Sequence, residues 1–482
     1  MKQIYSSLIL LFFLDVSFTL SQIFVNPPFA QYGVYDLDGI KPQEYQQRRA
    51  AVIAEMDSGS IAVFRAKDPD DRNGGTDYKF RQNDNFLYLT GCNETNSTLI
   101  LAPNGIRIDS VTIAKEILFV SEYAKSWSGP NLGLEGAKQV LGFGAEGTKS
   151  VVLTIEKLKE LLPQIFKSRN ILYYTPSLRN ILFDPISNAK FAVEREMRKQ
   201  LEGKYPNLVI KSSGSLVSNL RSVKSKDELM LMQKAIEATV FGCIEAMKSC
   251  EPGMYEYELQ AIIEYCYTRS GCEFYGFPSI VGSGPNTLNY HYDTNRRQMN
   301  SGELVVMDIG AEYHSYSADV TRTIPVNGTY SPAQKEIYEL VLNAQNSAIK
   351  EVRSNVPMNV SGKKAFEVLG EGLVRLGIIQ DKNDVKKYCP HGVSHFVGLD
   401  VHDVGSAERL LPGMVFTMEP GLYIPDSSNC DKKYWGIGIR IEDDVLVTDN
   451  GCKVLSEAAP RTIREIEVLM KQGKNKNEKK QK

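Results

Sequence analysis

Four acidic residues in the second half of this sequence lie in or directly beside predicted strands, three of them in or beside apolar stretches and Asp319 in a polar one. Asp308 follows the run in "ELVVMDIG", Asp319 lies in "YHSYSADVTRT", Glu419 follows "GMVFTM", and Glu442 lies inside "GIGIRIEDDVLVT". Short apolar runs bounded by turn residues predict buried strands. A buried carboxylate is costly unless a cation pairs with it. Any fold of this chain must therefore bring positive charge to these acids.

The alternation within "GIGIRIEDDVLVT" predicts which acids share a pocket. Successive residues of a strand point to opposite faces, so Arg440 and Glu442 lie on one face and Asp443 on the other. A single acid at a strand end is often a turn cap or an ion-pair partner. However, Arg440 and Arg322 cannot neutralise four acids, whereas two divalent cations would. Neutral carboxylic acids, the alternative, would need far more apolar isolation.

Three of the five histidines of the chain fall in "HGVSHFVGLDVHDVG", at His391, His395 and His402. Glycines and β-branched valines argue against a helix here, and Gly392 stands where a helical HExxH zinc motif needs glutamate. An oxygen-rich site with one imidazole suits Mn²⁺, Co²⁺ or Zn²⁺. Two such ions can share an activated hydroxide, which is the nucleophile of a hydrolase.

Four separated motifs resemble the metallopeptidases that include aminopeptidase P and prolidase, which share the pita-bread fold. They are "DIGAEYHSYSADVTRT", "HGVSHFVGLDVHDVG", "FTMEPGLYI" and "GIRIEDD". Upstream, "RRAAVIAEMDSGSIAVFRA" and "YKFRQNDNFLYLTGCNE" resemble, more loosely, the N-terminal domain of aminopeptidase P. The expected fold class is α/β (α+β), with an N-terminal mixed α/β domain at 35–215 and a pita-bread metallopeptidase domain at 222–470.

The resemblance also implies a dinuclear metal centre, usually of manganese, with zinc or cobalt as alternatives. Position by position, its ligands would be Asp308, Asp319, His395, Glu419 and Glu442. In the family pattern Asp319 and Glu442 bridge the two ions, and Glu419 also handles the proton of the bridging water.

Further site residues follow from the same resemblance. His291, in "GSGPNTLNYHYDTN", aligns with a family histidine beside the scissile bond. His402 would stabilise the developing oxyanion, and His391 and Arg440 would line the proline side of the substrate. His314 matches no functional position and is interpreted as a structural or surface residue.

The function expected from these residues is that of an exported Xaa-Pro aminopeptidase, which removes an N-terminal residue when proline follows. Prolidase, which cleaves Xaa-Pro dipeptides, is the near alternative, and a catalytically silent binding module on the same scaffold is the distant one. Proline-containing peptides are the expected partners, and a homo-oligomer (dimer or tetramer) is expected. A net charge of −2 gives no basic field for nucleic acid.

The two ends of the chain have compositions of their own. Lys2 followed by "LILLFFL" and "TLSQ" predicts a signal peptide at 1–21 and an extracytoplasmic mature protein, with an uncleaved anchor as the competing interpretation. The apolar run is too short to favour a membrane span. "KQGKNKNEKKQK" predicts a disordered tail at 471–482. The eight cysteines permit disulfides, or they are buried free thiols.

The first half of the chain alternates between helical and extended patterns. "SIAVFRA", "NFLYLTG", "TLILAP", "EILFVS" and "NILYYT" predict strands, and 151–163 and 187–202 predict helices. The pattern changes near 222, where a long amphipathic helix begins with acidic residues. We therefore place the domain boundary near 215–222.

Overall fold

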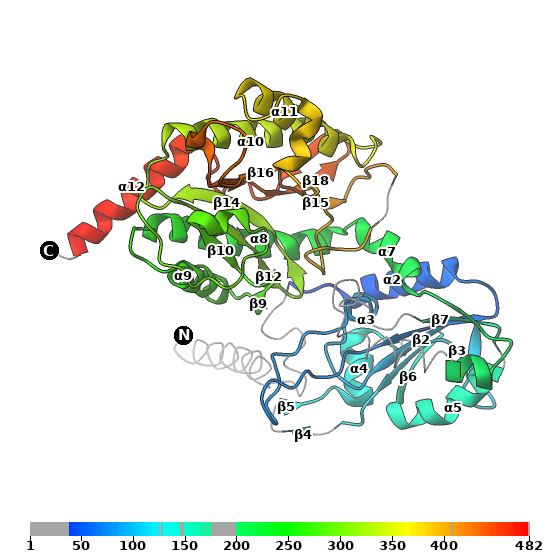
Figure 1. Cartoon of the computed structure of the whole chain (residues 1–482). Helices are drawn as coiled ribbons and strands as arrows, with labels where there is room; N and C mark the ends of the chain where they lie inside the picture. The colour runs from blue at the N-terminus through cyan, green and yellow to red at the C-terminus, as the bar shows by residue number, and fades with distance from the viewer. Residues whose placement is uncertain are drawn as a thin grey trace, which may run out of the picture. The chain divides into compact units, whose positions relative to one another are not determined.

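The computed structural model describes residues 38–123, 125–126, 129–144, 149–167, 169–174, 199–405 and 408–480. The predicted signal peptide at 1–21 and most of the predicted helix at 187–202 lie outside these residues. The chain divides into two compact units, Met1–Leu216 and Val217–Lys482 (Figure 1). The exact limits of 35–215 and 222–470 stay a prediction.

The first unit is built on one mixed sheet with strand order β6-β3-β2-β1-β7-β8. β1 and β3 each pair with β2 in antiparallel fashion, and the outer pairs β3–β6, β1–β7 and β7–β8 are parallel. The strands are β1 (Ser60–Arg65), β2 (Thr98–Arg107), β3 (Ile113–Val120), β6 (Ser150–Thr154), β7 (Ile171–Tyr174) and β8 (Val209–Lys211). A short hairpin joins β4 (Lys125–Ser126) to β5 (Gly129–Pro130), and the helices are α2 (Pro42–Glu55), α3 (Asp84–Thr90), α4 (Gly133–Leu141) and α5 (Ile155–Lys167).

Two expectations for this unit are wrong. The segment "NFLYLTG" is helix α3 rather than a strand, because the Asn83 side chain caps its first turn and Gly91 ends it in the left-handed conformation. Residues 151–154, expected to begin a helix, are strand β6, because "SVVLT" pairs with β3 in parallel and the helix begins only at Ile155.

The second unit places its strands between two pairs of helices. α8 (Lys226–Ser249) packs on α9 (Glu256–Arg269) over one side of the strands, and α10 (Pro332–Lys350) packs on α11 (Val360–Arg375) over the other (Figure 1). A capping box between Ser225 and Glu228 fixes the start of α8, as the acidic first turn predicted. The other helical segments are α7 (Gly214–Ser222), η2 (Gly284–Leu288), η3 (Lys382–Lys387), η4 (Lys432–Tyr434) and α12 (Ile463–Lys480).

Short antiparallel sheets fill the space between these helices. One contains β10 (Ile280–Ser283), β11 (Leu304–Ile309) and β14 (Val320–Pro325), and another contains β15 (Val415–Met418), β18 (Asp443–Thr448) and β19 (Gly451–Val454). β9 (Phe274–Tyr275), β12 (Ala311–Tyr313) and β13 (Tyr316–Ser317) form a third sheet, and β16 (Gly421–Ile424) pairs with β17 (Ile437–Arg440). The expected α/β (α+β) class is confirmed.

Helix α12 packs on α8 and continues to Lys480, into the segment 471–482. The disordered tail at 471–482 stays a prediction. None of the helices in the described ranges combines the length and the apolar character that a membrane crossing needs.

All eight cysteines are free thiols, and six of them are buried. Burial raises the pKa of Cys92 to about 12 and that of Cys243 and Cys389 to about 11. Each unit is therefore folded without a disulfide.

Candidate metal centre

Strand ends bring the predicted acids together from distant parts of the sequence. Asp308 lies in β11 opposite Thr321 of β14, and Asp319 directly precedes β14. Glu419 directly follows β15, and Glu442 joins β17 to β18. Antiparallel pairing of these strands thus turns four separate motifs into one cluster of carboxylates.

These acids line a cavity of about 710 Å³ within the second unit. The walls include every residue that the sequence assigned to the site: Asp308, Asp319, His395, Glu419, Glu442, His291, His391, His402 and Arg440. Apolar side chains complete the cavity: Phe277, Pro278, Ile280 and Val401. By contrast, His314 lies in a turn beside Glu273 and does not line the cavity.

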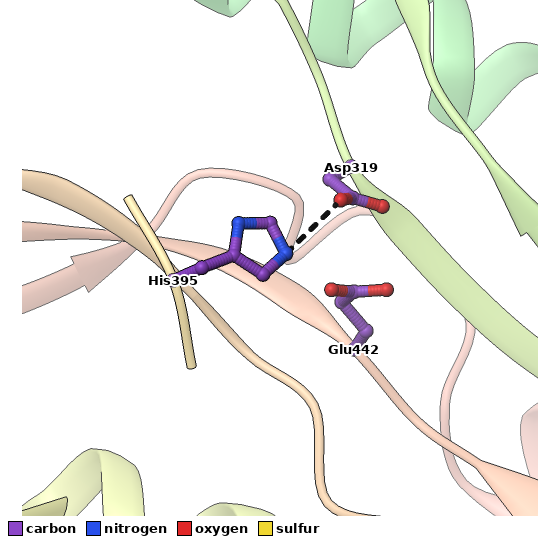
Figure 2. A group of neighbouring side chains, drawn as sticks. All are labelled: Asp319, His395 and Glu442. Atoms are coloured by element: carbon purple, nitrogen blue, oxygen red, sulfur yellow. Dashed lines mark ion pairs between the residues drawn. The ribbon is translucent and has the colours of Figure 1, made fainter. Parts of the chain in front are cut away.

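Asp319, His395 and Glu442 are placed as three metal ligands would be. Their side chains point toward one another in Figure 2, and one ligand atom of each lies within 4.8 Å of the other two. His395 Nε2 lies 3.5 Å from Asp319 Oδ2 and 3.5 Å from Glu419 Oε1. His395 Nδ1 lies 3.1 Å from the carbonyl oxygen of Phe396, which holds the proton on Nδ1. The lone pair of Nε2 is therefore directed at the acids.

The pKa shifts and the unpaired oxygens of this cluster are those expected of carboxylates that bind cations. Burial, followed by the neighbouring carboxylates, raises the pKa of Asp319 and of Glu419 well above the usual range, and burial and Asp308 raise that of Glu442 to about 8. Asp308 Oδ1 and Asp319 Oδ1 are buried without a hydrogen-bond partner among the described residues. Both features are expected of carboxylates whose partners are metal ions.

Two of the histidines are neutral at pH 7. Burial lowers the pKa of His391 to about 4, and burial and His402 lower that of His395 to about 4. The rings of His395 and His402 meet edge to face at 4.4 Å. A neutral imidazole is the form that binds a metal ion.

Arg440 is the cation that contacts this cluster directly. Its Nη2 lies 2.6 Å from Asp308 Oδ2, and its Nη1 donates to the Tyr423 hydroxyl at 2.9 Å. The same hydroxyl lies 3.0 Å from His391 Nε2. One guanidinium thus links an acid of the cluster to Tyr423, against which the rings of Tyr290 and His391, the aromatic wall of the cavity, are packed. Tyr423 was not singled out from the sequence, although it lies in the quoted motif "FTMEPGLYI".

Arg322 does not line the cavity, but its hydrogen bonds fix the segment that carries Glu442. It is fully buried, bonds to Asp443 Oδ1 at 2.8 Å, and donates to the carbonyl of Glu442 at 2.6 Å. Asp443 faces this arginine, and Glu442 faces the cavity with Arg440, as the strand alternation predicted. Asp444, also buried, accepts from the backbone N–H of Asp319 at 3.1 Å. These contacts fix the two segments that carry Asp319 and Glu442.

A second buried cluster holds the segment with the three histidines. Arg221 Nη2 bonds to Asp400 at 2.8 Å and also contacts Asp403, and Lys224 Nζ lies 3.1 Å from Asp403. All four side chains are nearly inaccessible to solvent. Asp403 is adjacent to His402, so this arrangement of two cations and two acids determines where that histidine lies. Sequence reasoning missed it, because no local pattern pairs residues that are 180 positions apart.

Comparison with known proteins identifies a family for each of the two units. Residues 230–449 match metallopeptidase family M24, and residues 45–173 match the aminopeptidase P N-terminal domain. The Xaa-Pro aminopeptidases of Haemophilus influenzae and Escherichia coli are 35% and 33% identical to this chain, each over 89% of it and over 97% and 98% of their own lengths. The solved structure of the Pseudomonas aeruginosa aminopeptidase PepP is 34% identical, with a TM-score of 0.78 over 91% of this chain and 99% of its own.

The expected fold and family are thereby confirmed, with a pita-bread domain after an aminopeptidase P-type N-terminal domain. The chain belongs to metallopeptidase family M24, and it is a metal-dependent aminopeptidase of that family.

Proposed function

We propose that this chain is a Xaa-Pro aminopeptidase that releases an N-terminal residue when proline follows it. The observation that carries the proposal is the single cavity in which four carboxylates, a neutral histidine and an aromatic wall converge. The names and near-complete coverage of the two curated relatives support the same substrate class.

We propose two divalent cations, Mn²⁺ with Zn²⁺ or Co²⁺ as alternatives, held by Asp308, Asp319, His395, Glu419 and Glu442. Five ligands, four of them carboxylates, match the preference of these ions. Asp319 and Glu442, which have ligand atoms within 4.8 Å of each other and of His395, would be the ligands shared by both ions. When bound, such ions polarise the scissile carbonyl and activate a water molecule at neutral pH.

The residues around the acids would perform the remaining steps. Glu419 would accept the proton of the attacking water, since its carboxylate lies at the cavity wall beside both His395 and His391. His402 would donate a hydrogen bond to the oxyanion, and His291 would contact the scissile amide, since both line the cavity.

The aromatic wall of Tyr290 and His391 would recognise proline. Both rings pack against Tyr423, Tyr290 at 4.6 Å and His391 at 5.5 Å between ring centres, and Arg440 holds the Tyr423 hydroxyl. A pyrrolidine ring has no N–H and is apolar, so flat aromatic faces suit it better than hydrogen-bonding groups would.

Two peptides distinguish this function from its alternatives. Metal-loaded protein should cleave Ala-Pro-Ala faster than the dipeptide Ala-Pro, whereas a prolidase would show the reverse order. Absence of both activities, together with absence of bound metal by elemental analysis, would indicate a binding module.

We propose that the protein is exported and acts outside the cytoplasm as a dimer or tetramer. The proposal on location rests on the n-region and h-region pattern at 1–21. N-terminal sequencing of protein from fractionated cells tests it, because a chain that begins at Met1 in the cytoplasmic fraction would contradict export. Light scattering of the purified protein tests the oligomeric state.

A further inference from the structure

One buried carboxylate accepts hydrogen bonds from residues on both sides of His291. Glu256 is the first residue of α9 and is fully buried. Its Oε1 accepts from the Ser283 N–H at 2.7 Å, from the Ser283 hydroxyl at 2.7 Å and from Asn286 Nδ2 at 3.1 Å. Its Oε2 accepts from the Tyr292 hydroxyl at 2.8 Å and from the Arg297 N–H at 2.9 Å. Five donors on one carboxylate satisfy it without a buried counter-ion.

The donors come from both sides of His291. Ser283 and Asn286 precede it in β10 and η2, and Tyr292 and Arg297 follow it. Tyr292 is the next residue along the chain, so its hydroxyl fixes the backbone of the turn that presents His291 to the cavity. The imidazole of His291 is itself exposed, and its position depends on this backbone.

The same face of α9 supports the segment at a second point. Gln260, one turn after Glu256, accepts from Asn295 Nδ2 at 3.0 Å, and Asn295 Oδ1 accepts from the Val281 N–H at 2.9 Å. Asn295 has a positive φ of 49°, which marks a sharp turn held by side-chain bonds. On the other side η2 packs on β17 so closely that a Cβ at Gly438 would lie 2.3 Å from the Thr287 carbonyl oxygen.

We propose that Glu256 is a positioning residue of the reaction, acting through His291 without touching the substrate. The inference rests on the proposed function and adds a residue to it. A carboxylate has only acceptor oxygens and can satisfy all five donors, whereas an amide cannot. Loss of one acceptor oxygen would release one side of the segment and displace His291 from the scissile bond.

The test is a double-mutant cycle on Ala-Pro-Ala hydrolysis with Glu256→Gln and His291→Ala. Glu256→Gln should lower kcat and kcat/KM together by about 10- to 100-fold, the usual cost of losing the partner that orients a site residue. In the His291→Ala background the same change should cost less than about twofold, because the group through which it acts is gone. Equal losses in both backgrounds would overturn the inference and assign Glu256 a general structural role.

Glu258→Gln provides a matched control. Glu258 lies in the first turn of the same helix and accepts from the Tyr255 N–H at 2.7 Å, outside the segment that presents His291. This variant should retain activity within about twofold of wild type. A loss equal to that of Glu256→Gln would also overturn the inference.

Two further measurements do not depend on the reaction. Hydrogen exchange at the Ser283 and Arg297 amides should accelerate in Glu256→Gln, while the metal content stays that of wild type.

If Glu256→Gln does not fold, Tyr292→Phe provides a milder variant. It removes a single donor and should lower kcat/KM about fivefold, again only when His291 is present. Unchanged exchange or an undiminished loss without His291 refutes the positioning role. A wild-type chain that cleaves no Xaa-Pro peptide refutes the proposed function itself, and the inference with it.

Discussion

Removing the metal ions should make the stability of the second unit fall as pH rises above neutrality. Without cations, burial and Asp308 raise the pKa of Glu442 from 4.5 to about 8, and the pKa values of Asp319 and Glu419 shift in the same direction. Between these two values the folded apo protein binds more protons than the unfolded chain. Its free energy of unfolding therefore decreases as pH rises through that range.

The histidines set the lower limit of the pH range in which this decrease in stability can be measured. The pKa values of His391 and His395 are lowered from 6.5 to about 4, so these groups destabilise the folded state only as pH falls below 6.5. Among the shifted groups of this cluster, the carboxylates are therefore the ones whose protonation differs between the folded and unfolded states from pH 6.5 to 8. Glu442 alone should then cost about 2 kcal/mol over the window, since one pKa unit corresponds to about 1.4 kcal/mol. For a unit of this size that is a decrease of about 4–8 °C in Tm.

Calorimetry of chelated and Mn²⁺-loaded protein at several pH values within the window is the assay. The apo protein should show the decrease, and the loaded protein should show much less of it, because bound cations stabilise the ionised carboxylates throughout. Apo Glu442→Gln should show a smaller slope than apo wild type. An apo Tm that is constant or rises between pH 6.5 and 8 would refute the reasoning.

Three substitutions test other parts of the second unit. Glu419→Gln should lower kcat by at least about 100-fold even at saturating Mn²⁺, since a general base contributes that much, and it should also weaken metal binding because Glu419 is a proposed ligand; retained turnover would contradict its role. Arg221→Met should lower the free energy of unfolding by about 3–5 kcal/mol in urea titrations, because Asp400 and Asp403 stay buried after they lose their shared arginine; a neutral effect would show that the cluster is dispensable. Gly310→Ala should lower the free energy of unfolding by about 2 kcal/mol or more in the same titration, because its Cβ would lie 1.9 Å from the Ala318 carbonyl oxygen. Gly392→Ala, whose Cβ would have no heavy atom within 4 Å, serves as the neutral control.

Asp308, Glu419 and Glu442 could be predicted from the sequence because they lie in or directly after apolar strand patterns, whereas Asp319 lies in a polar strand pattern. Strand alternation separated Glu442 from Asp443, and the structure turns the first toward Arg440 and the second toward Arg322. The ligand roles themselves stay a prediction, since geometry alone does not record which ion the acids bind.

The supporting contacts could not be predicted, because they join positions with no shared local pattern. Glu256 looks like an ordinary first-turn acid of an amphipathic helix, and nothing in the sequence points to Ser283 or Tyr292 as its partners. Helix α3 was misassigned for a related reason. Its apolar residues fit a strand equally well, and only the caps at Asn83 and Gly91 decide between the two.

The buried thiols give this protein built-in reporters of local opening. Cys92 is the only cysteine of the first unit, and Cys243 and Cys389 are deeply enclosed in the second. Because their thiols stay protonated and shielded while the fold is closed, a maleimide in solution can label them only during transient exposure. Mass-resolved labelling would thus record how often each half of the molecule opens, without adding a probe.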